Sequence, residues 1–347
     1  MGDFVWFFMK YLVVTVCFLS VLVRPVAAQS PAGDAKAWKR YQSAGDKALK
    51  AKDSLEAERQ FTLAVAEAEK IQKGEGKLRE SLDDLAPLLL NHRKYERAQA
   101  AFERLCVLYA KELGSNHMRF AECLVGLGHA CAYSKKLFEA EEALLQARRI
   151  IERKVGENYA GMTENHPAMI QVRSSLAFVN AEQGRHADAE ALYRSAIEMA
   201  ERPRVEYRRR ANGAVEEVRY TPPYQLIAGL HNDLGLLLAS QDRLAEAEAS
   251  FKHAQRTFQT GYGKESSGVA LSLGNLGRVY LKQNKFAEAE EALKQALTLR
   301  EKGFAPHHPI IADTLEMLAA AQSRRDPELA KATLKRAQQI RAAGAAQ

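Results

Sequence analysis

The sequence predicts an all-α solenoid built from stacked helix-turn-helix repeats, and three observations lead to this prediction. One short pattern recurs seven times in 347 residues, and its marker alanine returns at steps of 41, 42, 49, 58, 42 and 41 residues. Hydrophobic residues make up 47% and charged residues 27%, which suits amphipathic helices. Strand signals are confined to one inserted segment. The marker alanines are Ala57, Ala98, Ala140, Ala189, Ala247, Ala289 and Ala330.

The sixth copy shows most clearly why each repeat forms two helices. Leu273, Leu276 and Tyr280 recur at helical spacing, so they share one face of a first helix. A polar break at residues 282–285 leaves room for only a turn, so the second helix must pack antiparallel to the first. A small residue on each helix marks the expected crossing. These pairs are Gly45 and Ala57, Ala86 and Ala98, Gly128 and Ala140, Ala177 and Ala189, Gly235 and Ala247, Gly277 and Ala289, and Ala319 and Ala330.

This pattern resembles the tetratricopeptide repeat (TPR) family, whose signature is matched by Leu273, Leu276, Gly277, Tyr280, Ala289, Leu293 and Ala296. The period near 42 residues and the linker at residues 307–309 are similar to the repeats of kinesin light chains. The resemblance implies a right-handed superhelix and says little about function, because such repeats serve unrelated systems. The expected segments are a lead at 29–35, a solenoid at 36–341 with repeats 36–76, 77–117, 118–166, 167–203, 224–265, 266–308 and 309–341, and a tail at 342–347.

Residues 1–28 predict a secretory signal peptide. Residues 11–23 are apolar or small and carry no charge, and Ala28 provides the small residue that a signal peptidase requires. We therefore expect a mature chain that starts at Gln29 and is periplasmic, in a bacterium, or secreted. The alternative is an uncleaved membrane anchor, because residues 4–8 extend the apolar stretch to about twenty residues, enough to span a bilayer.

Residues 204–220 interrupt the repeat period and predict an inserted β-hairpin, because Asn212-Gly213 lies between β-branched and aromatic residues. Folding about that turn aligns apolar and oppositely charged pairs. The expected pairs are Val205 with Tyr220, Glu206 with Arg219, Tyr207 with Val218, Arg208 with Glu217, and Arg209 with Glu216. We expect Arg208, Arg210 and Arg219 to face an acidic partner. The alternative is a solvated arginine-rich loop.

Three cysteines follow the signal segment. Cys106 and Cys123 are equidistant from the predicted turn at residues 114–117, so they could face each other as a disulfide in an exported protein. The alternative is that both of them and Cys131 are buried small hydrophobic residues.

The chain contains no motif for catalysis or for phosphate binding. Its nine histidines are scattered over different repeats, so the sequence predicts no metal site and no cofactor. Glu-Ala-Glu boxes recur in most repeats, and we interpret them as solvated helix faces. The net charge of +7 is modest, and without a basic-aromatic motif it does not indicate nucleic-acid binding.

Function is therefore expected from a surface. In the TPR family the first helices of the repeats line a concave groove, and the positions opposite the packed stripe are the candidates here. Asparagine can bind a peptide backbone, and arginine or lysine can bind a carboxylate. The expected partner-binding residues are Glu122, His129, Tyr133, Phe178, Glu182, Asn232, Asp233, Leu236, Asn275, Arg278, Lys282 and Arg324.

These observations predict an exported scaffold or adaptor that binds an unidentified protein or peptide and is not an enzyme. One alternative is a membrane-anchored assembly factor, which differs only in keeping residues 1–28. Another alternative is an enzyme with an unrecognised hydrolase site in the insertions. The arginine-rich residues 204–219 contain no nucleophile, which argues against it.

Overall fold

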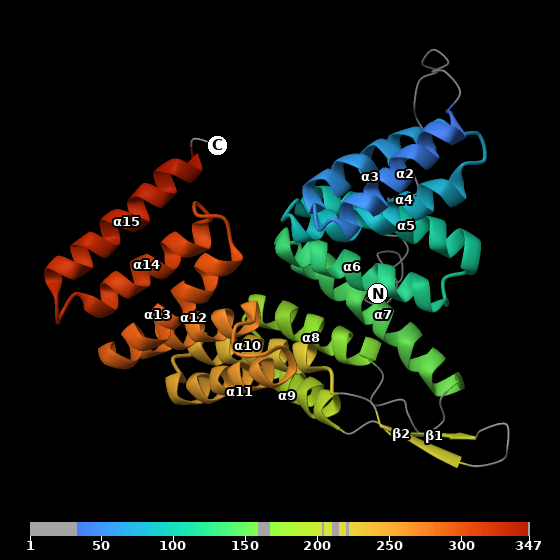
Figure 1. Ribbon diagram of the computed structural model, residues 1–347. Helices are drawn as coiled ribbons and strands as arrows, with labels where there is room; N and C mark the ends of the chain where they lie inside the picture. The colour runs from blue at the N-terminus through green and yellow to red at the C-terminus, as the bar shows by residue number, and fades with distance from the viewer. Residues whose placement is uncertain (1–32, 159–166, 203–204, 210–214, 220–221, 346–347) are drawn as a thin grey trace, which may run out of the picture. The chain divides into compact units, whose positions relative to one another are not determined.

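The computed structural model describes residues 33–158, 167–202, 205–209, 215–219 and 222–345. Within them the chain forms fourteen helices and two strands (Figure 1). It divides into two compact units, Met1–Leu88 and Leu89–Gln347. The helices are α2 (Ala35–Lys50), α3 (Ser54–Ala68), α4 (Glu75–Asn91), α5 (Tyr95–Leu113), α6 (Met118–Tyr133), α7 (Leu137–Asn158), α8 (Pro167–Glu182), α9 (His186–Glu201), α10 (Tyr224–Ser240), α11 (Leu244–Tyr262), α12 (Ser267–Lys282), α13 (Phe286–Gly303), α14 (Pro309–Gln322) and α15 (Pro327–Ala345).

Consecutive helices follow the predicted repeats in sequence order, and α2 with α3, α6 with α7, α8 with α9, α10 with α11, α12 with α13 and α14 with α15 pack as pairs. The last helix continues past the predicted end of the solenoid at residue 341 to Ala345. No helix of the described ranges is long and apolar enough to cross a membrane. The predicted signal peptide and its cleavage point lie outside the described residues.

In the first unit, α2 packs on α3, and a chain of buried polar groups joins α2 to α4. Trp38 Nε1 donates to Ser81 Oγ at 2.9 Å, and Ser81 Oγ donates to Gln42 Oε1 at 2.9 Å. Gln42 Nε2 then donates to Asp84 Oδ2 at 2.5 Å. Burial raises the pKa of Asp84. The polar side chains of α2 in this series thus bond to partners on α4, which avoids the desolvation cost of an unpaired group.

In the second unit, each helix from α5 to α14 packs on the helix that follows it. The first helices of successive repeats, α6, α8, α10, α12 and α14, also contact one another. Figure 1 shows α10 to α15 following one another pair by pair. This arrangement brings the first helices of repeats 3 to 7 into one continuous layer. The marker alanines are all buried at the packed face.

Glycines in four first helices accommodate a large side chain from the second helix. A Cβ added at Gly277 would lie 2.5 Å from Cγ of Leu293, a distance at which the helices would have to separate. The partner is therefore Leu293, one turn beyond the predicted partner Ala289. The same contact, sixteen residues along the chain, joins Gly45 to Phe61, Gly128 to Leu144, and Gly235 to Phe251.

The turns inside the repeats share a left-handed residue. It lies five positions before the marker alanine in repeats 1 to 6. Only Gly184 among the six is a glycine; the others are Lys52, Arg93, Lys135, Asp242 and Asn284, with φ between 58° and 61°. Such a residue ends a helix by letting the chain reverse within a few residues. The last repeat lacks it, in agreement with its spacing of eleven residues instead of twelve.

In repeats 3 to 6 the glutamate after the marker alanine bonds to the next repeat, so the interpretation of the Glu-Ala-Glu boxes as solvated faces is wrong for the second glutamate in these repeats. Its partner is the basic residue four or five positions before the next marker alanine. Glu290 is the most buried of these glutamates, with only 5% of its side chain exposed. The pairs are Glu141 with Arg185 at 2.7 Å, Glu190 with Arg243 at 2.5 Å, Glu248 with Lys285 at 3.0 Å, and Glu290 with Arg325 at 2.7 Å.

The inserted segment contains two antiparallel strands, β1 (Val205–Arg209) and β2 (Val215–Arg219). Their register differs by one residue from the predicted one: Val205 pairs with Arg219, and Arg208 pairs with Glu216. The predicted pairing is therefore wrong. A two-residue turn encloses an even number of residues between partners, whereas the pair Arg209–Val215 encloses five. The predicted turn Asn212-Gly213 lies outside the described residues.

Cys106, Cys123 and Cys131 are buried and form no disulfide with one another. The possible disulfide between Cys106 and Cys123 is not formed. Cys123 Sγ instead donates to the backbone oxygen of Phe102 at 3.2 Å. The three side chains occupy helix-packing positions, which corresponds to the alternative of buried small hydrophobic residues.

Candidate functional site

Two adjoining hollows cross the first helices of repeats 3 to 5, and together we call them the groove. The larger has a volume of about 700 Å³ and lies between α6, α8 and α10. The smaller, of about 520 Å³, continues along α10 toward Tyr262 at the end of α11. Ser174 and Asp233 line both hollows. The groove is thus a single concave surface in the second unit, built from the layer of first helices.

The repeat explains which side chains face the groove. Tyr133 and Glu182 each lie seven residues before a marker alanine, and Phe178 and Leu236 each lie eleven residues before one. Asp233 lies fourteen residues before its marker. Positions separated by three, four and seven residues share one face of a helix, so the first helices of repeats 3 to 5 present the same face to the groove.

Aromatic rings form one wall of the larger hollow. The ring of Tyr133 stacks on Tyr95 with centroids 5.0 Å apart and contacts Phe178 at 5.2 Å. Tyr133 remains 47% exposed, and Leu236 across the hollow is 43% exposed. Exposed apolar side chains gathered in a concavity are typical of surfaces that bind a partner.

The polar groups of the larger hollow include an imidazole. His129 Nε2 lies 2.5 Å from Ser175 Oγ. Burial lowers the pKa of His129, so its ring is neutral at pH 7. Glu182, at the rim, forms an ion pair with Lys135. His129 thus offers a neutral hydrogen-bonding group, and the charge of Glu182 is already neutralised by Lys135.

Asp233 differs from both, because within the described part of the chain no group donates a hydrogen bond to its carboxylate. The Asp233 side chain is exposed to solvent, although it lines both hollows. Desolvation in this concave position raises the pKa of Asp233 to about 6. Burial also raises the pKa of Tyr133, and repulsion from the Asp233 carboxylate adds to that rise. Among the residues that the structure describes, the Asp233 carboxylate of the groove thus has no counter-charge.

Six of the predicted partner-binding residues line the larger hollow: His129, Tyr133, Phe178, Glu182, Asp233 and Leu236. Asn232 and Asn275 do not, and their prediction as surface residues is wrong. Both are buried between α10 and α12, where Asn275 Nδ2 donates to Asn232 Oδ1 at 3.4 Å and Asn232 Nδ2 donates to Ser272 Oγ at 3.4 Å. Each of the two side chains points toward the neighbouring first helix. The repeat pattern alone does not show that this side of the helix is covered.

The other predicted residues line neither hollow. Glu122 is exposed and pairs with Arg119 at 3.2 Å, and Lys282 Nζ donates to the backbone oxygen of Ala239 at 3.1 Å. Arg278 is exposed, and the guanidinium of Arg324 lies 4.7 Å from the ring centre of Phe286. Arg208 and Arg219 belong to the strands, and Arg210 lies outside the described residues.

Several groove residues were missed from the sequence. Ser175 lies fourteen residues before its marker alanine, as Asp233 does, so the repeat could have indicated it. Tyr193 could not be found in this way, because it occupies the position that holds the core residues Phe251 and Leu293 in other repeats. Burial raises the pKa of the Tyr193 hydroxyl.

Comparisons with known proteins agree with this architecture. Two family models described as tetratricopeptide repeat match residues 170–202 and 226–302, which lie in repeats 4 to 6. The comparison with curated protein sequences found no match.

Solved structures show the same fold at low sequence identity. BtubC (BKLC) from P. vanneervenii has a TM-score of 0.54 at 20% identity and covers 74% of this chain and 93% of its own. Apo RapI has a TM-score of 0.55 at 14% identity, covering 87% of this chain and 76% of its own. The Rap conjugation gene regulator of plasmid pLS20, in complex with the Phr* peptide, has a TM-score of 0.54 at 12% identity, covering 88% and 94%. Repeats 4 to 6 thus match tetratricopeptide-repeat family models, and the chain shares its fold with solved structures of helical repeat proteins.

Proposed function

We propose that the chain is an exported adaptor that binds a peptide segment of a partner protein in the groove. The tetratricopeptide-repeat fold is typically a non-catalytic scaffold suited to protein–protein interaction. The fold can hold a peptide, since the Rap regulator of pLS20 was solved with one. The proposal itself depends on the groove of this chain.

The proposal rests on the position of the Asp233 carboxylate in the groove. This carboxylate is exposed where the two hollows meet, and within the described residues no cation lies against it, so it is available to a bound partner. A lysine or arginine of a bound peptide would supply the missing charge and donors. Tyr133, Phe178 and Leu236 lie beside it and offer contact to an apolar side chain. We therefore expect a segment with one basic residue and one aromatic or aliphatic anchor.

Selection from a random peptide library tests this. The purified protein is used as bait, and the affinities of the selected peptides are measured by calorimetry for the wild type and for Asp233→Asn, Phe178→Ala and Arg278→Gln. We expect the first two variants to bind at least about tenfold more weakly, which corresponds to about 1.4 kcal/mol. Arg278 is exposed and lies outside both hollows, so its variant serves as the matched control.

The dependence on pH provides a second readout. Because the pKa of Asp233 is raised to about 6, binding of a basic residue should weaken as the pH falls through about 6. The same change should be absent in Asp233→Asn. If the selected peptides bind Asp233→Asn and Phe178→Ala as tightly as the wild type, the partner does not occupy the groove.

Export is the second element of the proposal, supported by the apolar run of residues 11–23 and by the small residue Ala28. The mature chain should begin at Gln29. Mass spectrometry of the protein from its native host tests this directly. An intact Met1 start in the membrane fraction would instead favour an anchored assembly factor.

The inserted segment is the third element, and we assign it a role in partner specificity. It interrupts the spacing that the flanking repeats keep, although those repeats have interfaces of their own. Replacing residues 204–220 by a short Gly-Ser linker should preserve helicity and weaken binding of the native partner. Global unfolding of this variant would assign the segment a bracing role, and undiminished binding would remove it from recognition.

A further inference from the structure

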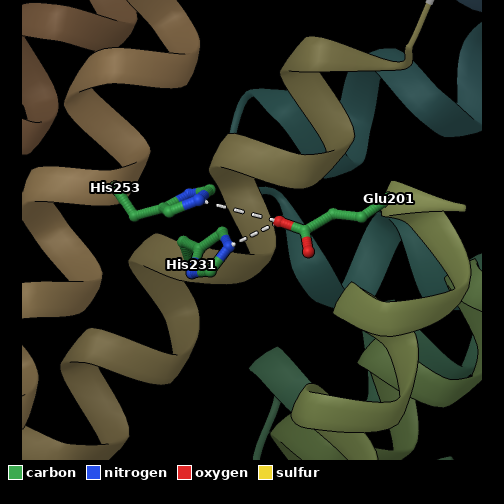
Figure 2. A group of neighbouring side chains, drawn as sticks. All are labelled: Glu201, His231 and His253. Atoms are coloured by element: carbon green, nitrogen blue, oxygen red, sulfur yellow. Dashed lines mark hydrogen bonds and ion pairs between the residues drawn. The ribbon is translucent and has the colours of Figure 1, made fainter.

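Three potential metal ligands from three helices meet on the side of repeats 4 and 5 that does not line the groove. Glu201 is the last residue of α9, His231 lies in α10, and His253 lies in α11. Figure 2 shows the carboxylate of Glu201 reaching toward both imidazole rings. None of the three belongs to either hollow.

The distances fit a single cation. One carboxylate oxygen, Glu201 Oε1, lies 3.2 Å from His231 Nε2 and 3.8 Å from His253 Nε2. All three ligand atoms lie within 4.8 Å of one another. Bonds of about 2.0–2.1 Å to a tetrahedral Zn²⁺ place neighbouring ligand atoms about 3.3 Å apart. The separation between Glu201 and His231 is near that value and the one between Glu201 and His253 is longer, so the side chains must adjust when an ion binds.

The surroundings orient the ligands. The imidazoles of His231 and His253 stack with centroids 3.8 Å apart at an angle of 30°, so one ring must turn away from the other before both Nε2 lone pairs converge on one ion. His253 Nδ1 lies 3.4 Å from Thr257 Oγ1, one helical turn onward. A proton held on Nδ1 by that hydroxyl leaves Nε2 free to act as a ligand. The His231 side chain is only 13% exposed and is held in place by its neighbours.

From this geometry we propose that Glu201, His231 and His253 bind a first-row divalent transition metal, with Zn²⁺ as the reference ion. Two imidazole nitrogens and a carboxylate suit such ions. Mg²⁺ and Ca²⁺ prefer sites built entirely from oxygen ligands, so they should bind poorly here. Three protein ligands leave a fourth position for water or for a group from a partner. The ion would tie the end of α9 to the α10–α11 pair, immediately before the inserted segment.

Calorimetric titration of the full chain tests the proposal. The protein is purified without a histidine tag, treated with a chelator and titrated with Zn²⁺, Mg²⁺ or Ca²⁺. We expect one Zn²⁺ per chain and at least about tenfold weaker binding in Glu201→Gln and in His253→Asn. Both replaced side chains are 42% exposed, so the variants should fold. The exposed His307, remote in sequence and outside the cluster, provides the matched control variant His307→Gln.

A second measurement distinguishes a specific metal site from nonspecific binding of Zn²⁺ to other histidines. Because the ion binds only the folded state, Zn²⁺ should raise the melting temperature of the wild type and of His307→Gln, but not of the two ligand variants. Stoichiometric binding that persists unchanged in both ligand variants would overturn the proposal. So would the lack of stoichiometric binding in the wild type, or equal binding of Mg²⁺ and Zn²⁺.

Discussion

Replacing Glu248 by glutamine removes a carboxylate that joins repeats 5 and 6, and we expect this to lower the free energy of unfolding. The carboxylate accepts from Lys252 at 2.6 Å within its own helix and from Lys285 of the next repeat at 3.0 Å. The Tyr280 hydroxyl approaches it at 3.4 Å. Its side chain is only 15% exposed, so the neutral amide would leave two cations without their partner.

The size of the effect follows from the pKa of Glu248. Burial alone would raise this pKa, but the hydrogen bonds from Lys252 and Lys285 outweigh burial and lower it from 4.5 to about 2. At about 1.4 kcal/mol per pKa unit, the difference corresponds to roughly 3 kcal/mol. Both lysines are nearly half exposed, and screening by solvent reduces the contribution. We therefore expect a loss of about 1–3 kcal/mol at pH 7.

Chemical denaturation followed by circular dichroism measures this loss at several pH values. Because the pKa of Glu248 is lower in the folded state, its contribution is fully present above pH 4.5 and disappears as the pH falls toward about 2. The difference between the wild type and Glu248→Gln should shrink over that range. Glu288→Gln changes the first glutamate of the equivalent box in repeat 6, which is exposed, and should cost less than about 0.5 kcal/mol. Equal losses in the two variants, or a loss that does not depend on pH, would refute the assignment of Glu248 as a link between repeats.

Three further outcomes are expected. Gly277→Leu should cost about 1–3 kcal/mol by overpacking against Leu293, and an unchanged thermal melting curve would contradict that contact. Lys52→Gly should stabilise the protein by about 0.5–1 kcal/mol because φ is 61° there, whereas Ala51→Gly, at φ −78°, should not; denaturant midpoints compare them. Burial raises the pKa of the Cys131 thiol to about 11, so a maleimide at pH 8 should modify it in urea but not in the folded protein, and rapid labelling of the folded chain would show that the thiol is accessible.

The groove could be predicted largely from sequence because it depends on a local property. Residues seven, eleven and fourteen positions before the marker alanine share a helical face, and the repeat supplies that face again in each first helix. This placed Tyr133, Phe178 and Leu236 correctly at one surface. The burial of Asn232 and Asn275 could not be predicted in the same way, because it depends on how closely two first helices approach each other.

Spacing within about forty residues was enough to predict the helix pairs, the turns between them and the face that each first helix presents. The tertiary structure decided contacts between segments that no local period relates. It set the strand register of the inserted segment, buried Asn232 against Asn275, and brought Glu201, His231 and His253 together from three helices. Such contacts depend on the distance and angle at which neighbouring helices pack, and these are set by side-chain volumes across the interface rather than by the pattern along the chain.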